Sequence, residues 1–286
     1  MIPAEFDYQA PRSLADALGL LRATPGAKVL SGGMSLLPAL KQRLLELPLL
    51  VDLGRVPGLD GIARRGERFV LGARATHAAI GISPVLEGLT LVAEAAHEIG
   101  DLQVRNLGTI GGSLVHADPA ADWPAVFLAL DGDARVVGSQ GERTVPAARF
   151  FTGMLSTAVG PDEVVTEITL AARAGRVGSA YVKMRQPASG FAVVGVAAIV
   201  LLDARGRCEH IALGVTGINA VPFRASSAER KLTGTPLADA DVASACAAIE
   251  EADPLGDLFA SAPYRRHLLS VYARRAIARA RERAAR

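Results

Sequence analysis

The chain has 286 residues, of which 50% are hydrophobic and 21% are charged, and its formal net charge is +2. A chain of this length and composition can bury one large core or two medium ones, which excludes a disordered protein. The small net charge and the lack of an aromatic-and-basic motif argue against a nucleic-acid-binding protein.

The number of cysteines and the hydropathy of the chain exclude further classes of protein. Cys208 and Cys246 are too few for a structural zinc site or an iron–sulfur cluster held by this chain alone. They also predict no disulfide framework, as expected in a reducing compartment. The first residues lack the basic and apolar start of a secretory signal, and the longest apolar run, residues 191–202, is too short to span a bilayer. We expect a cytoplasmic protein, with peripheral attachment at the inner membrane face as a further option.

The first half of the chain predicts mixed α/β structure. Residues 28–30 and 49–52 predict strands, and residues 35–47 predict a helix from leucines spaced three and four apart. A strand at 69–71 and a buried helix at 89–99 follow. Residues 106–122 are rich in Gly, Ala and Asp without clear periodicity, which predicts a long functional loop.

The second half predicts strands and then helices. The expected strands cover residues 134–137, 164–170, 179–182, 191–202 and 211–215. An arginine-rich helix is expected from about residue 263. The linker-like segment 173–176 suggests two domains, residues 1–175 and residues 176–286.

The first candidate site is the segment Ser31-Gly32-Gly33-Met34-Ser35, between a predicted strand and a predicted helix. Glycines allow positive φ and remove the Cβ atoms that would block a ligand. The amides of such a turn favour an anion, which makes a pyrophosphate cradle possible. The alternative is an ordinary strand–helix turn with Ser35 as the N-cap. The spacing matches neither the dinucleotide fingerprint nor the P-loop.

The second candidate site begins with Thr109-Ile110-Gly111-Gly112-Ser113 and continues to Asp122. Thr109 and Ser113 could donate to phosphate or ribityl oxygens, and Asp118 and Asp122 could accept from ligand hydroxyls or a ring N–H. The alternative is a turn in which Asp122 caps a helix that starts at Pro124. Two such loops together indicate a nucleotide-like cofactor, and residue patterns alone lead no further.

Both loops resemble a known family. The segments SGGMSLLP at 31–38 and NLGTIGGSLVHADPAAD at 106–122 are similar to the FAD-binding medium subunit of aerobic carbon monoxide dehydrogenase and its xanthine dehydrogenase relatives, the molybdenum hydroxylases. The segments GARATH at 72–77 and AYVKMR at 180–185 also fit. The resemblance covers essentially the whole chain.

The resemblance implies an α+β fold. Its first part is a two-subdomain FAD-binding domain of the type shared by vanillyl-alcohol oxidase and para-cresol methylhydroxylase (PCMH). Its second part is a C-terminal carbon monoxide dehydrogenase flavoprotein-like domain with a three-stranded antiparallel sheet and a helical bundle. The residues it assigns to FAD binding are Val29, Leu30, Ser31, Gly32, Gly33, Met34, Ser35, Leu36, Ile99, Thr109, Ile110, Gly111, Gly112, Ser113, Asp122, Val165 and Lys183. It assigns no catalytic residue and no metal ligand to this chain.

Two positions depart from the family pattern. Carbon monoxide dehydrogenases usually read AGGHS in the first loop, whereas this chain has Ser31 and Met34. Many relatives carry an acidic residue where this chain has Gly190. The phosphate cradle should survive both changes, but they give no support for carbon monoxide as the substrate. Lys183 has two interpretations, a cation near the flavin or a strand-edge lysine that faces water.

The implied function is electron transfer. A large molybdopterin subunit would oxidise the substrate, a small subunit would carry two [2Fe–2S] clusters, and this chain would pass electrons through FAD to an external acceptor. The expected assembly is a dimer of heterotrimers, a heterohexamer, without nucleic acid. NAD, a quinone, a cytochrome and oxygen all remain compatible as acceptors, and the substrate is read by another chain.

Two other functions remain open at this stage. One is a self-contained flavoprotein reductase of the same FAD fold, such as the enzyme that reduces an enolpyruvyl sugar nucleotide in cell-wall synthesis. The other is a non-catalytic assembly protein that has lost FAD, which the intact paired glycines of both loops disfavour. The arginines of the C-terminal helix have two interpretations as well, a solvated basic face or a docking surface for an acidic partner or an anionic membrane.

Overall fold

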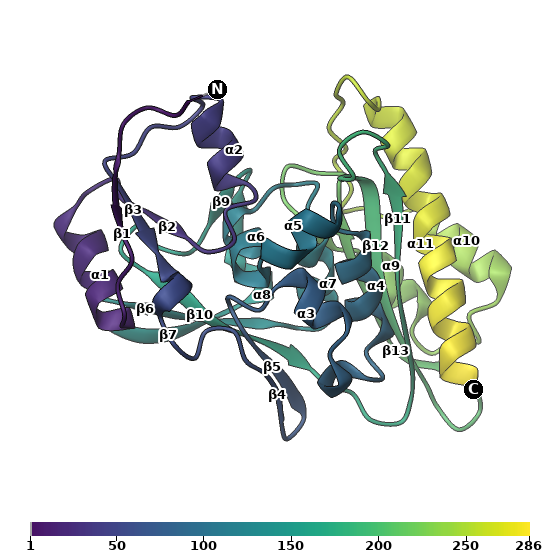
Figure 1. Ribbon diagram of the computed structural model, residues 1–286. Coiled ribbons are helices and arrows are strands. Elements are labelled where there is room, and N and C mark those ends of the chain that lie inside the picture. The colour runs from purple at the N-terminus through teal and green to yellow at the C-terminus, as the bar shows by residue number, and fades with distance from the viewer. Residues whose placement is uncertain (1) are drawn as a thin grey trace.

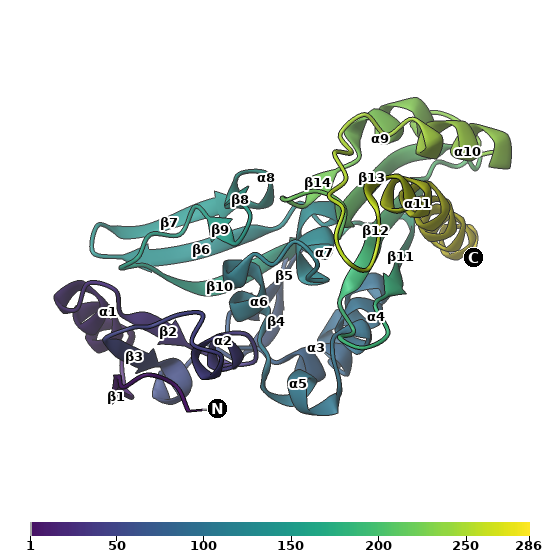
Figure 2. The same cartoon turned by 90° about the horizontal axis from the view of Figure 1, so that it is seen from above.

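The computed structural model describes residues 2–286 and contains three main sheets that follow one another along the chain. In Figures 1 and 2 the N-terminal unit and the C-terminal helix lie at opposite ends of the molecule, with the helices of residues 77–129 between them. This mixed α/β architecture agrees with the expected α+β fold.

The N-terminal unit is a three-stranded parallel sheet with the strand order β1-β3-β2. Ala17 and Leu21 of the first helix pack with Leu49 and Val51 of the middle strand, so the apolar stripe of the helix covers the sheet. The elements are β1 (Asp7–Gln9), α1 (Leu14–Ala23), β2 (Lys28–Leu30), α2 (Leu36–Lys41), β3 (Leu49–Asp52) and the 3₁₀ turn η1 (Leu53–Arg55).

The expected helix at residues 35–47 is shorter than its leucine spacing suggested. Helix α2 ends at Lys41, and Arg43 has a φ of 56° in the left-handed region. Leu47 still reaches the small core with Leu40 and Leu50, although it lies in an irregular segment. The leucine spacing therefore correctly indicated burial, but the helical prediction was wrong beyond Lys41.

A five-stranded antiparallel sheet with the order β4-β5-β10-β6-β7 forms the second unit. From Thr166 onward its central strand, β10, alternates buried and partly exposed residues, as expected for a sheet with one covered face. The elements are β4 (Ile62–Arg65), β5 (Arg68–Gly72), β6 (Asp133–Gly138), β7 (Gly141–Pro146), α8 (Ala147–Phe150), β8 (Phe151–Gly153), β9 (Ser156–Thr157) and β10 (Val164–Ala171).

The middle of the chain is helical where a loop was expected. Thr109 caps a helix, residues 110–116, in the middle of the predicted loop 106–122, and its hydroxyl accepts from the Gly112 amide. Ile110 and Leu114 lie four residues apart and are buried, which gives this short helix its core contact. The elements are α3 (His77–Gly81), η2 (Pro84–Leu86), α4 (Thr90–Glu98), α5 (Leu102–Leu107), α6 (Ile110–His116) and α7 (Trp123–Ala129).

The C-terminal unit is an antiparallel sheet with helices on both faces. Strand β12 is apolar throughout because Ala197 and Ile199 join one core and Val196, Ala198 and Val200 join the other. The elements are β11 (Arg176–Arg185), β12 (Ala192–Leu202), β13 (Cys208–Thr216), β14 (Phe223–Arg224), α9 (Ser226–Leu232), α10 (Asp239–Ala247) and α11 (Ala262–Ala285). The two-residue β14 joins the three expected long strands.

The arginines of α11 do not form one solvated face. Arg265 is buried and donates to the carbonyls of Val193 and Gly217 and to the Asp257 carboxylate. Others, such as Arg274, line a surface hollow. Part of the basic helix is therefore structural. Among residues 2–286, no helix combines the length and the apolar character needed to cross a bilayer.

Candidate functional site

A cleft of about 450 Å³ lies where the three units meet, within the size range of small-molecule and cofactor sites. All predicted site residues except Leu30, Ile110 and Lys183 line it. Ile110 is buried in the core beneath the cleft, and Leu30 packs with the α2 cluster. The two glycine loops, about eighty residues apart in the sequence, therefore share one cavity.

Direct contacts hold these two loops together. The Ser31 and Thr109 hydroxyl oxygens lie 3.0 Å apart, in hydrogen-bonding distance. A Cβ atom placed on Gly32 would lie 2.1 Å from the Leu107 carbonyl oxygen, which no side chain tolerates. Glycine at position 32 is therefore needed for the close approach of the first loop to the backbone that leads into the second.

The first loop offers amide groups to a ligand. Within residues 2–286, no acceptor lies in hydrogen-bonding position for the amides of Gly32, Gly33, Met34 and Ser35. Gly33 has a φ of 75°, so the loop takes a conformation that other residues rarely adopt. The Ser35 side chain makes no capping hydrogen bond, which leaves its hydroxyl available too. Successive free amides in a turn form an anion-binding concavity.

The second loop contributes differently from the expectation. The Ile110 amide donates to the Ala75 carbonyl, the Gly111 amide to the Ala73 carbonyl and the Gly112 amide to the Thr109 hydroxyl. These amides are engaged within the protein, so the second loop, unlike the first, does not present them to a ligand. A Cβ on Gly112 would meet only the Thr109 hydroxyl oxygen, at 2.8 Å. The second loop thus supplies open space and the Ser113 hydroxyl.

A buried ion pair lies at another part of the cleft. The Asp122 carboxylate accepts from the Tyr181 hydroxyl at 2.5 Å and from the Lys183 ammonium at 2.9 Å. Lys183 also donates to the Glu98 carbonyl at 2.9 Å, and its side chain has no exposed surface. The alternative in which Lys183 is a strand-edge lysine facing water is therefore wrong. Asp122 precedes α7 but makes no side-chain capping bond, so the capping alternative is wrong as well.

Burial dominates the electrostatics of this cluster. It raises the pKa of Asp122 from 3.8 to about 6, while Lys183 and Tyr181 lower it in opposition. Burial and the neighbouring Asp122 carboxylate raise the pKa of Tyr181 well above its usual value. At neutral pH the cleft therefore contains an ionised Asp122, held in place by two donors from strand β11.

His77 holds the segment that leads into the second loop through hydrogen bonds. Its Nδ1 accepts from the Trp123 indole at 2.9 Å, and its backbone amide donates to the Gly108 carbonyl at 3.0 Å. Burial, reinforced by Arg105, lowers the pKa of His77 from 6.5 to about 4. The imidazole is therefore neutral at physiological pH and serves as a packing and hydrogen-bonding group.

Several cleft residues escaped the sequence interpretation. Arg74 belongs to the GARATH segment, but its type alone did not indicate a role. Gly190, which was noted only as a departure, lines the cleft with a φ of 75° beside Phe191. The further lining residues that were not predicted are Lys28, Leu45, Leu53, Ala73, His77, Gly100, Val104, Gly108, Val115, His116, Ala121, Leu155, Val159, Glu163, Val164 and Ser189.

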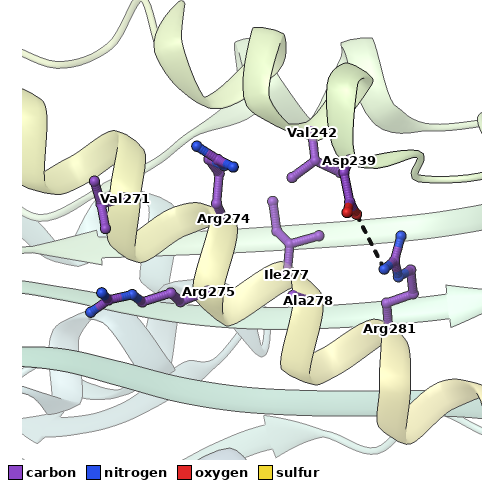
Figure 3. Close-up of a pocket in the computed structure, with 8 residues that line it drawn as sticks. All are labelled: Asp239, Val242, Val271, Arg274, Arg275, Ile277, Ala278 and Arg281. Carbon is purple, nitrogen blue, oxygen red and sulfur yellow. Dashed lines mark hydrogen bonds and ion pairs between the residues drawn. The ribbon is translucent and has the colours of Figure 1, made fainter.

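A second hollow of about 320 Å³ lies between α10 and α11 (Figure 3). Arg281 faces Asp239 there, and Val242 and Ile277 provide apolar surface. None of the predicted cofactor residues lines this hollow. Within residues 2–286 there is also no group of three or more His, Cys, Asp or Glu side chains arranged to hold a metal ion.

The two-loop cleft fits a ligand that carries a diphosphate. Free amides at residues 32–35 match phosphate oxygens, and Gly112 leaves room beside them. The buried Nε of Arg74 has no acceptor within residues 2–286 and therefore lacks a partner that an anion could supply. Asp122, elsewhere in the same cleft, can accept from a ring N–H.

Comparisons with known proteins agree with this chemistry. Residues 4–171 match the family described as the FAD binding domain in molybdopterin dehydrogenase, and residues 179–280 match the CO dehydrogenase flavoprotein C-terminal domain. The chain is 36% identical to the 6-hydroxypseudooxynicotine dehydrogenase complex subunit alpha of Paenarthrobacter nicotinovorans, over 99% of this chain and 97% of that protein.

Carbon monoxide dehydrogenases show the same similarity. The medium chain from Hydrogenophaga pseudoflava is 36% identical over 97% of both chains. In the solved structure of the carbon monoxide dehydrogenase from that organism that lacks the Mo-pyranopterin moiety of its molybdenum cofactor, one chain superposes with a TM-score of 0.94 at 37% identity. The match covers 99% of each chain.

The buried Asp122–Lys183 pair should contribute to the stability of the flavin-free chain. Asp122→Asn in the flavin-free chain should lower the free energy of unfolding by about 3 kcal/mol, because it leaves a buried ammonium without its counter-charge. Asp122→Asn combined with Lys183→Met should recover most of that loss. Urea unfolding of the three proteins measures this. A double variant that is less stable than Asp122→Asn would contradict the ion-pair interpretation.

The lowered pKa of His77 should make the free energy of unfolding depend on pH. Since its folded pKa of about 4 lies below the unfolded 6.5, its contribution to stability is complete above pH 6.5 and is lost as the pH falls. Between pH 7 and pH 5 the wild type should lose about 2 kcal/mol through this group. His77→Gln should lack this component.

Comparing the wild type with His77→Gln separates the pH dependence that is due to His77 from that of other groups. The raised pKa of Asp122 acts in the opposite direction, since acidification to below pH 6 favours its folded, protonated form equally in both proteins. The measurement is the unfolding free energy of each protein at both pH values. Equal pH slopes for wild type and variant would exclude a buried neutral His77.

Proposed function

The chain belongs to the FAD-binding medium subunits of the molybdenum hydroxylases, and from that premise we propose that it passes electrons from iron–sulfur clusters of a partner subunit, through FAD in the two-loop cleft, to an external acceptor. The observation that carries this proposal is the shared cavity, in which the Ser31–Thr109 contact brings both glycine loops to one ligand-sized space. FAD supplies one- and two-electron chemistry when bound.

The chain's own residues bind and orient the cofactor in this proposal. The amides of residues 32–35 hold the diphosphate, and the Ser35 and Ser113 hydroxyls donate to neighbouring oxygens. Asp122 accepts a hydrogen bond from the flavin ring. Lys183 acts as a positioning residue through Asp122, because the Lys183 side chain has no exposed surface of its own. Ile99 and Val165 offer apolar contact inside the cleft.

The cysteines support a division of labour between subunits. Both are buried, and burial raises the pKa of Cys208 to about 11 and that of Cys246 to about 12. Burial therefore disfavours their thiolate forms, and two cysteines are also fewer than the four ligands of a [2Fe–2S] cluster. This supports clusters on a small partner subunit. The family membership of the chain supports a molybdenum cofactor on a large subunit, and we include a dimer of heterotrimers in the proposal.

The domain arrangement belongs to the proposal as well. We place an FAD-binding domain at residues 1–175 and a C-terminal domain at residues 176–286. The second domain contributes Tyr181 and Lys183 beneath the cleft and residues 189–191 to its lining. Both parts are therefore needed for a complete cofactor site.

The substrate is determined outside this chain. The nicotine-derivative dehydrogenase subunit and the carbon monoxide dehydrogenase subunit are equally similar to it, at 36% identity, although the two complexes are named for unrelated substrates. Met34, which departs from the carbon monoxide dehydrogenase pattern, lines the FAD cleft. This fits a common electron-transfer subunit that serves different hydroxylases.

Gly112→Leu tests the proposal directly. The added Cβ would meet only the Thr109 hydroxyl oxygen, and the larger side chain would take up space at a position that lines the cleft, so the fold should persist while FAD is lost. Gly19→Leu is the matched control, because Gly19 lies in helix α1, does not line the cleft, and has open space within 4 Å of the point where a Cβ would stand. Flavin absorption of the purified chains is the measurement.

The expected result is a yellow wild type, a yellow Gly19→Leu protein and a colourless, folded Gly112→Leu protein. The wild type should also co-purify with an iron–sulfur subunit and a molybdopterin subunit when the three are expressed together. A folded Gly112→Leu protein that retains FAD as the wild type does would overturn the location of the site.

A further inference from the structure

Arg74 holds a position between the two glycine loops that no cofactor assignment includes. It follows Ala73, whose carbonyl accepts from the Gly111 amide at the base of the second loop. Its guanidinium reaches the Gly54 carbonyl, at 3.4 Å, just after strand β3. Strand β3 pairs with β2, which leads into the first loop. Arg74 therefore adjoins the second loop through Ala73 and contacts the N-terminal unit through Gly54, and it lines the cleft.

The positive charge of Arg74 is not paired with a carboxylate of the described residues. No carboxylate within residues 2–286 lies within 4.0 Å of its guanidinium nitrogens, and the contact with Gly54 is long for a hydrogen bond. The Nε atom is buried, and none of residues 2–286 provides an acceptor for it. A buried donor without a partner is costly, which makes its persistence in a cleft an indication of a ligand group.

The acidic residues of the cleft do not compensate Arg74. Glu163 is bound by Arg143 through two hydrogen bonds of 2.9 and 2.6 Å. Asp122 is paired with Lys183, and Asp118 accepts from the Ala120 amide. Each carboxylate thus has its own donor, and the unneutralised guanidinium favours an anion supplied from outside the chain.

We propose that Arg74 binds the diphosphate of the cofactor together with the first-loop amides, and so makes this cleft selective for a dinucleotide flavin. This inference rests on the proposed function of the cleft. A guanidinium forms paired hydrogen bonds with phosphate oxygens, which an exposed Lys28 at the cleft edge cannot reproduce. Riboflavin lacks the group that Arg74 recognises, whereas ADP carries it.

In the flavin-free chain, where no diphosphate is bound, replacing Arg74 should not lower the stability of the protein. Replacing Arg74 by Met keeps a long unbranched side chain and removes a buried, unpartnered donor. The flavin-free Arg74→Met protein should therefore have a melting temperature equal to or above that of the wild type. A purely structural role would instead give a lower melting temperature without any ligand dependence.

The experiment titrates the flavin-free full chain with FAD, ADP and riboflavin by calorimetry, for the wild type, Arg74→Met and Arg74→Lys. Loss of a charged hydrogen bond corresponds to about a tenfold to hundredfold weaker affinity. Arg74→Met should weaken FAD and ADP by this factor and leave riboflavin unchanged, with Arg74→Lys between the two. Arg64→Met is the matched control, because Arg64 is exposed, stacks on Phe69 and lies outside the cleft.

The outcomes separate this inference from the proposed function. If the wild type binds FAD and Arg74→Met binds it within a factor of two, only the role of Arg74 is overturned. Equal weakening of FAD and riboflavin would also overturn it, since that indicates general damage to the cleft. A wild type that binds none of the three ligands would overturn both. If Arg74→Met fails to fold, Arg74→Lys decides by the ratio of its FAD and riboflavin affinities.

Discussion

The contact between the two glycine loops is the constraint on which the rest of this structure depends. The hydroxyls of Ser31 and Thr109 join the loops, and Gly32 allows the first to rest against the backbone at Leu107. This contact brings the N-terminal parallel sheet and the central helices around one cavity, although each has its own core. With the loops apart, the amides of residues 32–35 would form an isolated turn exposed to water, where an anion binds weakly.

The C-terminal sheet contributes in a second way. Strand β11 carries Tyr181 and Lys183 beneath the cleft, where they hold the buried carboxylate of Asp122. Removing charges from water is costly, and a buried pair of this kind is weak evidence for stability but good evidence for a fixed polar group at a functional position. The close approach of α7 to β13, where a Cβ on Gly214 would lie 1.9 Å from the Ala125 carbonyl oxygen, packs the helix that follows Asp122 against this sheet.

Sequence patterns were sufficient where local chemistry and burial agree. The strand at residues 192–202 and the helix at 90–98 could be predicted because their apolar residues pack as their periodicity indicates. Helix α6 could not, since its paired glycines lower helix propensity and its stability comes from the Thr109 cap and from packing on Ala73. The glycine-loop residues of the cleft followed from the sequence motifs, but more than half of its lining, Arg74 included, did not. Arg74 stands out because its buried Nε finds no acceptor within residues 2–286, and this can be recognised only from its neighbours in the three-dimensional structure.

Hydrogen exchange of the backbone amides at residues 32–35, measured with FAD and with riboflavin at saturating concentrations, tests the central claim most directly. The account predicts that FAD slows exchange at these amides strongly while riboflavin does not, because only FAD brings a diphosphate to the first loop. Tight binding of FAD with unchanged exchange at all four positions would contradict it.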